Sequence, residues 1–259
     1  MNHGLSISAS GALTALYRQD LLAGNLANLD TVGFKPDIAV TRQRDPVRVE
    51  DNLPTWPSNA LLERLGGGVQ LAPNRVAFRQ GVLRATGNPL DAAIEGDGFL
   101  TVRVAGTGTT DRVRLTRDGR LALDARGRLV TAAGGLPVLD TGNREIRLSD
   151  SGPVVIAPDG TVKQGDTVVA QLALARVPDV RSLRKDGPGL FMQDATAAAS
   201  RSRASGRIVQ GFVEESSVDE IRVLMQIQDA AQAAQANIGL MTYHDRIMDQ
   251  AINRLGRVA

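Results

Sequence analysis

The chain has 259 residues, 42% of them hydrophobic, and a net charge of +2 from 30 Lys and Arg against 28 Asp and Glu, a composition typical of a globular protein. It contains no cysteine, which excludes disulfides, thiolate nucleophiles and cysteine-ligated metals. A histidine-based metal site or catalytic triad would depend on His3 or His244, and 3% aromatic residues leave few platforms for stacking bases or sugars.

Residues 4–30 predict an amphipathic helix. Steps of four and three residues trace an apolar seam with one polar member: Leu5, Ala9, Ala12, Leu16, Gln19, Ala23 and Leu26. Asn, Asp and Gly residues at 28–33 predict the end of this helix. We expect Gly33 to adopt the left-handed conformation there, which asparagine would also tolerate, and Phe34 to fold back on the last turn.

Residues 35–70 show no periodicity. Four prolines interrupt them, and three consecutive glycines at 66–68 close the segment. We expect an extended, partly ordered connector. The PxxP sequence at 54–57 resembles an SH3 ligand, but a single match in a proline-containing connector is most simply a chance one.

From residue 71 to residue 213 the apolar pattern has a period of two. Leu100, Val102 and Val104, for example, alternate with Thr101 and Arg103, and Gly-containing turn sequences separate such runs. Short alternating strands at this spacing predict an antiparallel β domain, either sandwich-like or barrel-like.

Residues 217–256 return to a helical period. The apolar seam consists of Leu224, Ile227, Ala231, Ala234, Ile238, Met241, Asp245, Met248, Ile252 and Leu255, with Asp245 as its polar member. Ser217 and Glu220 are spaced as a capping box. Such a helix would be about 55–60 Å long, which is more than a small globule can cover, so it requires a partner helix.

The candidate catalytic motifs are weak. Ser182 and Lys185 match S-x-x-K without its companion elements, and Gly106–Thr110 lacks the third glycine of a dinucleotide loop. Glu95 and Asp97, joined by Asp118 or Asp124, could act as paired carboxylates, but each Asp has a turn-like context. A cell-wall-acting enzyme or carbohydrate-binding module on the β domain therefore stays the alternative function.

Nucleic-acid and membrane binding are also disfavoured. The arginines of residues 111–128 alternate with Val and Leu, as on the solvated face of a sheet. Residues 1–34 contain one Lys or Arg, Arg18, where a membrane-surface helix would carry several. No apolar run approaches the roughly 20 residues of a membrane span, and the N-terminus has no pattern of a cleaved signal peptide.

Several segments resemble motifs of bacterial flagellar rod and hook proteins. Residues 23–35 resemble the signature ANNLAN-x-x-T-x-GFK, with Gly24 where Asn is usual. Residues 96–100, 115–134 and 156–162 are similar to the segments GxGFF, YTRxGxFxxDxxGxLVTxxG and I-x-x-DGTV. Residues 210–218 resemble QGxLExSNV, residues 231–237 take the place of QRAYEAN without its Arg and Tyr, and residues 251–253 match AIN.

The resemblance covers nearly the whole chain and is closest to the proximal or distal rod proteins. It implies a non-enzymatic structural subunit of the flagellar basal-body rod, without cofactors, metal, nucleic acid or a small-molecule substrate. It also implies a rod that transmits torque and encloses the export channel. The expected partners are copies of this chain, neighbouring rod and hook proteins and the flagellar type III export apparatus, which would carry the chain to the periplasm-spanning rod without a cleaved signal peptide.

The same resemblance implies an α+β fold in which the terminal helices form a coiled-coil inner layer and an antiparallel β-rich domain forms the outer layer. The expected domains are residues 1–34, the connector 35–70, the β domain 71–213 and residues 214–259. The expected subunit-contact residues are Leu5, Ala12, Leu16, Ala23, Leu26, Asn28, Gly33, Phe34, Leu224, Ile227, Ala231, Ile238, Met241, Met248, Ile252 and Leu255.

Overall fold

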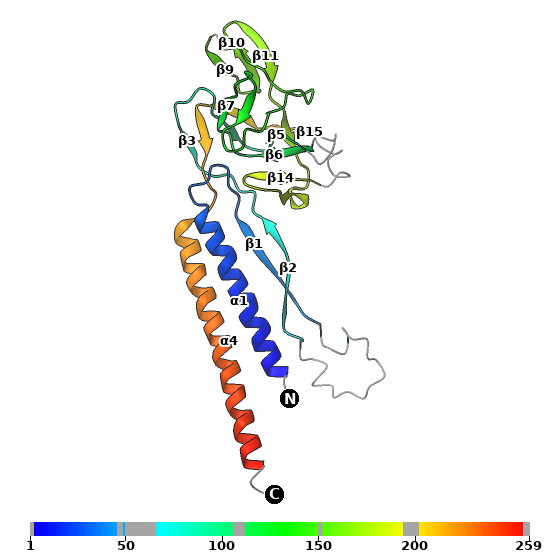
Figure 1. The fold of residues 1–259 in the computed structure, drawn as a ribbon, viewed down its shortest axis with the longest axis vertical. Helices are drawn as coiled ribbons and strands as arrows, with labels where there is room; N and C mark the ends of the chain where they lie inside the picture. Colours follow the sequence, from blue (N-terminus) through cyan, green and yellow to red (C-terminus); the bar gives the residue numbers. More distant parts are fainter. Residues whose placement is uncertain are drawn as a thin grey trace. The chain divides into compact units, whose positions relative to one another are not determined.

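In the computed structural model the chain has a long helix near each end and strands between them (Figure 1). The structure describes residues 3–45, 49, 66–105, 112–149, 152–193 and 202–255. The predicted α+β class with a central antiparallel β domain is confirmed. The PxxP segment at 54–57 and the sequence 106–110 lie outside the described residues. Among the helices that the structure describes, none is long and apolar enough to span a membrane.

The chain forms two compact units, which we call the helical unit and the β unit. The helical unit comprises residues 1–26, 37–75 and 219–259, and the β unit comprises residues 27–36 and 76–218. The β unit therefore contains a ten-residue segment that follows the N-terminal helix, in addition to the region in which the apolar pattern has a period of two.

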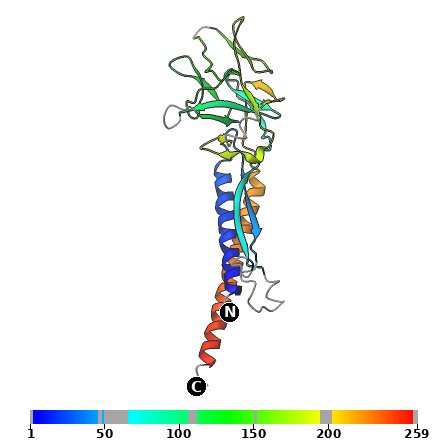
Figure 2. The same ribbon diagram turned by 90° about the vertical axis from the view of Figure 1, so that its right-hand side faces the viewer.

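The helical unit contains α1 (His3–Ala27) and α4 (Glu220–Leu255). With 36 residues, α4 is about 54 Å long. Strands β1 (Asp37–Gln43) and β2 (Val69–Val76) form a two-stranded sheet, and both views show it running along α1 (Figure 2). Asn74 donates a hydrogen bond to the Tyr17 hydroxyl at 2.6 Å, and the Val69 amide donates to the Ser10 hydroxyl at 3.3 Å. Both ends of the predicted connector are thus strands held against α1.

Polar side chains determine the helix ends. The Asn25 amide donates to the Asp37 carbonyl at 2.8 Å and accepts from the Asp37 amide at 2.9 Å, which fixes the start of β1 beside the end of α1. The predicted capping box at Ser217 is wrong. Asp219 caps α4 instead, because its carboxylate accepts from the Arg222 amide at 3.1 Å, one turn into the helix. Ser217 lies in the β unit, where its amide donates to the Phe34 carbonyl at 3.2 Å.

The β unit is built from antiparallel pairs of short strands. Its largest sheet has the order β13-β14-β6-β5-β12-β15, a second has the order β11-β10-β9, and three further pairs are β16-β4, β17-β3 and β7-β8. The strands are β3 (Leu83–Ala85), β4 (Ala92–Glu95), β5 (Phe99–Val104), β6 (Arg112–Thr116), β7 (Leu121–Leu123), β8 (Leu129–Thr131), β9 (Val154–Ile156), β10 (Thr161–Gln164), β11 (Thr167–Gln171), β12 (Leu174–Arg176), β13 (Arg184–Lys185), β14 (Leu190–Met192), β15 (Ser202–Arg203), β16 (Arg207–Gln210) and β17 (Phe212–Glu214). A 3-10 turn, η2 (Val180–Ser182), precedes β13.

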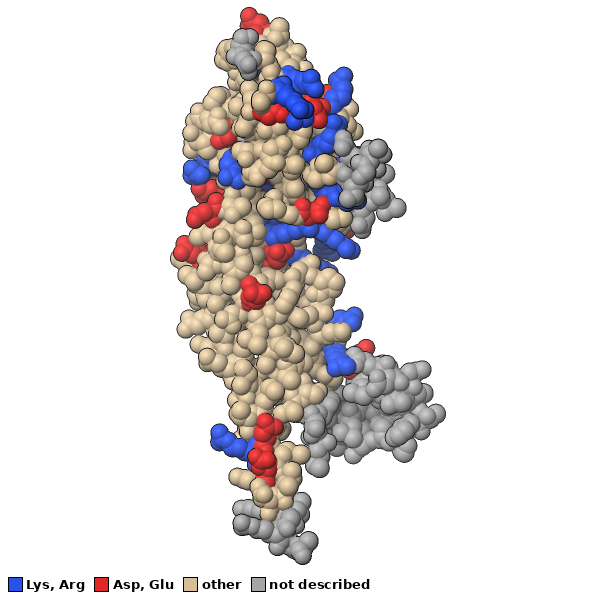
Figure 3. Space-filling model, in the orientation of Figure 1, with Lys and Arg blue, Asp and Glu red and all other residues tan. Residues whose placement is uncertain are grey.

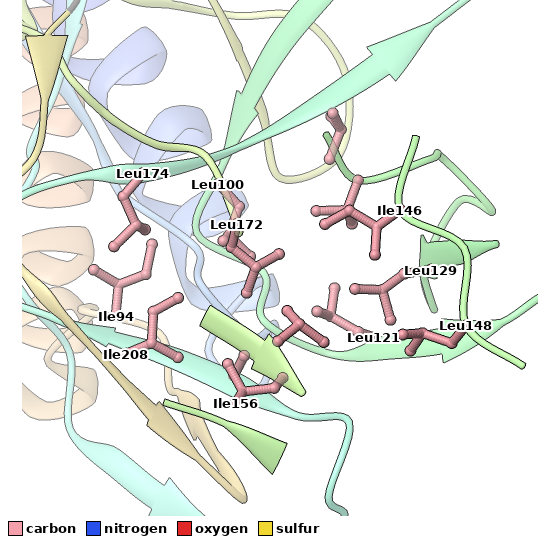
Figure 4. Close-up of a cluster of buried hydrophobic side chains, with 14 of the residues drawn as sticks. Ile94, Leu100, Leu121, Leu129, Ile146, Leu148, Ile156, Leu172, Leu174 and Ile208 are labelled. Atoms are coloured by element: carbon pink, nitrogen blue, oxygen red, sulfur yellow. The ribbon is translucent and has the colours of Figure 1, made fainter. Parts of the chain in front are cut away.

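The six-stranded sheet has an apolar cluster on each face. Leu100 and Val102 of β5 point into the larger cluster with Ile94, Leu172 and Ile208 (Figure 4). Side chains alternate across a strand, so Phe99 points to the opposite face and enters the second cluster, whose other buried members are Leu115, Ala175, Val177, Leu183 and Phe191. The expected alternation of side chains in β5 is therefore present, but residues 99–102 are buried on both faces of the strand, and only residues 103 and 104 are partly exposed.

Candidate functional site

Helices α1 and α4 lie antiparallel and side by side (Figure 1). A Cβ atom on Gly4 would lie 2.9 Å from Cε1 of His244, and a Cβ atom on Gly11 would lie 2.6 Å from Oδ1 of Asn237. The step from 4 to 11 along α1 matches the step from 244 back to 237 along α4, which defines the direction and register of the pair. Glycine permits the close approach at both points, because any larger residue would place a Cβ there.

Mostly small side chains line the buried faces of these helices. Apart from Asn25, whose amide bonds to Asp37, the buried residues are Ser8, Ala12, Ala15 and Leu22 on α1, and Val223, Ala230 and Ala234 on α4. Spacings of three, four and seven residues are typical of a helix–helix seam. We call these positions the buried seam.

The seam predicted from the sequence is displaced from the buried seam. Ala15 and Leu22 are buried where the sequence predicts Leu16 and Ala23, and Leu16 and Ile238 are each 46% exposed. Successive residues are about 100° apart around an α-helix. Because only about half of the seam positions shift by one residue, the average direction of the seam turns by about 50°. Because apolar residues occupy both positions, periodicity alone does not choose between them. Ala15 is buried because it lies four residues after Gly11, on the face of α1 that meets α4.

The expected contact residues fall into three groups. Ala12 and Gly33 are buried, and Leu5, Leu26, Asn28, Phe34, Ile227, Ala231, Met241 and Met248 are half-buried. The exposed members are Leu16, Ala23, Leu224, Ile238 and Ile252. The side chain of Leu255, the last residue of α4, lies outside the described part of the structure. Asn28, Gly33 and Phe34 belong to the β unit, and the other members belong to the helical unit.

Beside the buried seam, the helices carry large apolar side chains that the chain itself does not cover. They are Leu13 and Leu16 on α1, and Ile221, Leu224, Met225, Ile238, Leu240, Tyr243, Ile247 and Ile252 on α4. We call them the exposed apolar positions. Residues 230–243 of α4 include no Asp, Glu, Lys or Arg, and Figure 3 shows a broad area without charged side chains over the helices. An extended apolar surface of this kind is typical of an interaction surface.

A buried ionic cluster lies in the β unit. Glu214 is 0% exposed and Lys35 is 1% exposed, with Lys35 Nζ 2.5 Å from Glu214 Oε1. Arg117 Nη1 lies 3.2 Å from Glu214 Oε2, and the Gly81 amide donates to Oε1 at 2.8 Å. Lys35 also donates to the Arg79 carbonyl at 2.5 Å. Burial lowers the pKa of Lys35 below its usual value, although the neighbouring Glu214 carboxylate acts to raise it.

Sequence reasoning missed this cluster. Lys35 and Glu214 lie inside the family-like segments 23–35 and 210–218, and the sequence predicts Glu214 only as an acidic residue near the start of the C-terminal helix. The sequence feature that could have indicated their burial is a charged residue directly after an apolar one. Lys35 follows Phe34, and Glu214 follows Val213. That feature does not reveal the pairing, because the two residues are 179 positions apart.

Gly33 packs directly against this cluster. Its φ of +69° is left-handed, as the sequence predicts, and its amide donates to the Glu214 carbonyl at 2.7 Å. A Cβ atom at this position would lie 2.6 Å from the Arg117 carbonyl carbon and 2.7 Å from the Asp118 nitrogen. The expectation that asparagine is tolerated here is therefore wrong. Positive φ is only half of the constraint, and contact with backbone atoms excludes any side chain.

The residues considered for catalysis have structural partners. Glu95 pairs with Arg207 at 2.6 Å, Asp118 pairs with Arg120 at 2.7 Å, and Asp124 accepts from the amides of Arg126 and Arg128. The amides of Arg128 and Arg126 help to hold the pKa of Asp124 below its usual value.

Ser182 and Lys185 likewise have separate partners. The Ser182 hydroxyl donates to the Asp179 carbonyl at 2.7 Å, and Lys185 Nζ lies 4.2 Å from the centre of the Phe34 ring. Among the described residues, no three His, Asp or Glu side chains are grouped as metal ligands.

The arginines of residues 112–128 do not form a continuous solvated face. Arg114 is buried and pairs with Asp186, Arg117 belongs to the buried cluster, and Arg128 pairs with Asp124 at 2.7 Å. These three arginines form ion pairs with acidic residues of the β unit. The expectation of a solvated arginine face is wrong at Arg114 and Arg117, because Arg114 pairs with Asp186 and Arg117 pairs with the buried Glu214, 72 and 97 positions further along the chain.

These features define a structural protein, with a closely packed helix pair, an uncovered apolar surface and acidic residues engaged in turns and ion pairs. Residues 93–164 match the family described as "Flagellar hook protein FlgE/F/G D1 domain", and residues 5–35 match the family described as "Flagella basal body rod protein".

Full-length relatives agree with these matches. The chain is 33% identical over 261 residues to the flagellar basal-body rod protein FlgF of Caulobacter vibrioides, covering 100% of both chains. It is 30% identical over 257 residues to the FlgF of Rhizobium meliloti, covering 99% of both. Identity to the rod protein FlgG of Caulobacter vibrioides is 26% over 267 residues, covering 97% of this chain and 98% of the relative. The chain belongs to the flagellar basal-body rod protein family, whose members are structural subunits of the rod.

Proposed function

We propose that this chain is an FlgF-type rod subunit that polymerises with copies of itself and with neighbouring rod and hook proteins. The assignment to this type is supported by the identities to two relatives from one organism, 33% to FlgF and 26% to FlgG. In this proposal the rod spans the periplasm, transmits torque and encloses the export channel. The type III export apparatus delivers the chain to the rod.

The observation that carries the polymerisation is the exposed apolar surface beside the buried seam. Leu16 and Ile238 are each 46% exposed and Leu224 is 48% exposed, although all three lie on helices whose other faces are packed. Apolar burial contributes about 25 cal/mol per Å², so covering these side chains with a second helix pair favours association. Contacts of this kind that do not close on themselves generate a helical array, which has the form of a rod.

The proposal assigns roles to the segments. Residues 1–26 and 219–259 form an inner coiled-coil layer with neighbouring copies, and residues 37–75 belong to the same helical unit. The β unit, which adds residues 27–36 and 214–218 to most of the expected domain 71–213, forms the outer domain. The exposed members of the expected contact set, Leu16, Ala23, Leu224, Ile238 and Ile252, lie between copies.

Aspartate substitutions at the exposed apolar positions test this assignment. Leu16→Asp and Ile238→Asp place a charge at positions that are half exposed in the single chain, so its fold should be retained. Burying the same carboxylate between copies costs several kcal/mol. Cells that express either variant should export it, yet assemble no complete rod and fail to swim in soft agar.

The control is Asn143→Asp, which adds the same carboxylate at an exposed position of the β unit, outside both helices. It should leave rod assembly and swimming intact. Normal swimming by cells with Leu16→Asp and with Ile238→Asp would refute assembly through these helices.

A further inference from the structure

The ionic cluster of Lys35, Arg117 and Glu214 brings together four separate stretches of the β unit. Lys35 comes from the segment 27–36, which follows α1 in the chain, and Glu214 ends β17, shortly before α4. Arg117 follows β6, and the Gly81 amide precedes β3. The cluster forms only when residues 179 positions apart have met.

Glu214 is the member on which the others depend. Its carboxylate accepts from Lys35 Nζ, Arg117 Nη1 and the Gly81 amide, and its backbone carbonyl accepts from the Gly33 amide at 2.7 Å. No further carboxylate contacts either cation among the described ion pairs, so two buried cations share one buried anion. A buried charge without a partner is strongly unfavourable. Without Glu214, docking of segment 27–36 would place the positive charge of Lys35 near that of Arg117 with no negative charge between them.

The dependence also runs in the other direction. Without Lys35, the carboxylate loses its shortest ionic contact, and only Arg117, at 3.2 Å, balances its charge. Burial lowers the pKa of Lys35, and the nearby charge of Arg117 adds to that effect. The surroundings of Lys35 disfavour its charged form, and the Glu214 carboxylate is the group that stabilises the charge. The Ser217 amide, which donates to the Phe34 carbonyl at 3.2 Å, adds a backbone contact between the same two segments.

We propose that this cluster is a conformational latch, in which segment 27–36 docks on the β unit only together with segment 212–218. Glu214 closes the latch, because no other carboxylate in the described ion pairs contacts Lys35 from the N-terminal part or Arg117 from the middle of the chain. The segments that lead out of α1 and into α4 thus order as one unit. A chain in which residue 214 has not yet reached the β unit leaves segment 27–36 undocked.

Hydrogen exchange of the purified full-length chain tests the latch, with Glu214→Gln and Lys35→Met as variants. Coupling free energies between two sites change equilibria by about 5- to 150-fold and act equally in both directions. Glu214→Gln should therefore raise exchange in residues 28–36 by at least about fivefold, while residues 99–104 of β5 keep wild-type protection. Lys35→Met should raise exchange in residues 212–218 by a similar factor.

The control is Glu95→Gln, which removes the same charge from a 42% exposed side chain paired with Arg207. It should leave both segments protected. If Glu214→Gln does not fold, Lys35→Met still tests the coupling, because Arg117 and Glu214 remain paired in it. Wild-type exchange in the segment opposite each substitution would overturn the proposal, as would an increase that is equally large in β5, because that result indicates a general loss of stability.

Discussion

Gly33 lies with its Cα facing the backbone of Arg117, so closely that a Cβ atom would come within 2.6 Å of the Arg117 carbonyl carbon. The two residues belong to segments of the β unit that are far apart in the chain. This contact places the segment after α1 directly against the turn after β6, and it accounts for glycine at a position where left-handed backbone alone would also admit asparagine.

We expect Gly33→Ala and Gly33→Asn to destabilise the β unit by more than about 2 kcal/mol, because overpacking against backbone adds to the cost of positive φ. Denaturant unfolding measures the loss. Gly87→Asn is the matched control, since Gly87 has a φ of +74° and no atom within 4 Å of the Cβ position. It should cost less than about 1 kcal/mol. Equal stability of Gly33→Asn and the wild type would contradict the steric argument.

Gly11→Leu should separate α1 from α4. The Cβ position of Gly11 lies 2.6 Å from Asn237 Oδ1, and leucine adds three further carbon atoms at that point. We expect faster hydrogen exchange in residues 5–20 and 230–244, with the β unit unchanged. Gly24→Leu, on the same helix with no atom within 4 Å of its Cβ position, should instead strengthen the helix by about 0.5–1 kcal/mol. If both variants exchange alike, the register inferred from Gly4 and Gly11 is wrong.

Asp140→Asn should make the β unit less stable at neutral pH by about 1 kcal/mol. Although burial acts to raise the pKa of Asp140, hydrogen bonds from the Arg144 and Gly142 amides and the charge of Arg144 hold it below the usual 3.8. A lowered carboxyl pKa contributes stability that is fully present above the unfolded-state value and is lost as the pH falls through the folded-state value.

The stability difference between wild type and Asp140→Asn should therefore be constant above about pH 5 and shrink below about pH 4. Urea unfolding from pH 7 to pH 2.5 measures it. Asp166→Asn is the control for the loss of one negative charge from an exposed residue. A difference that grows on acidification would reverse the assigned sign.

The fragment 71–213 should fail to fold cooperatively, although it spans the whole predicted β domain. It retains Arg117 but lacks Lys35 and Glu214, and breaking a buried ionic cluster costs about 3–5 kcal/mol. The fragment 27–218 contains all three residues and should unfold cooperatively in urea. The same unfolding midpoint for both fragments would show that the cluster is dispensable for the β unit.

Local periodicity in the sequence determined the element types. The period of Leu5 to Leu26 predicts a helix, and the alternation at residues 100–104 predicts a strand, because each pattern depends only on residues a few positions apart. The order of the family-like segments likewise predicts the rod protein family, which the relatives confirm.

Only the tertiary structure decided which face of a helix is buried and which charges meet. Ala15 is buried and Leu16 is 46% exposed, because Ala15 lies four residues after Gly11, on the face of α1 that meets Asn237 and His244 of α4. Lys35 and Glu214 each appear in the sequence as single charged residues beside apolar ones. Their pairing depends on the path of the chain over 179 positions, which no local pattern encodes.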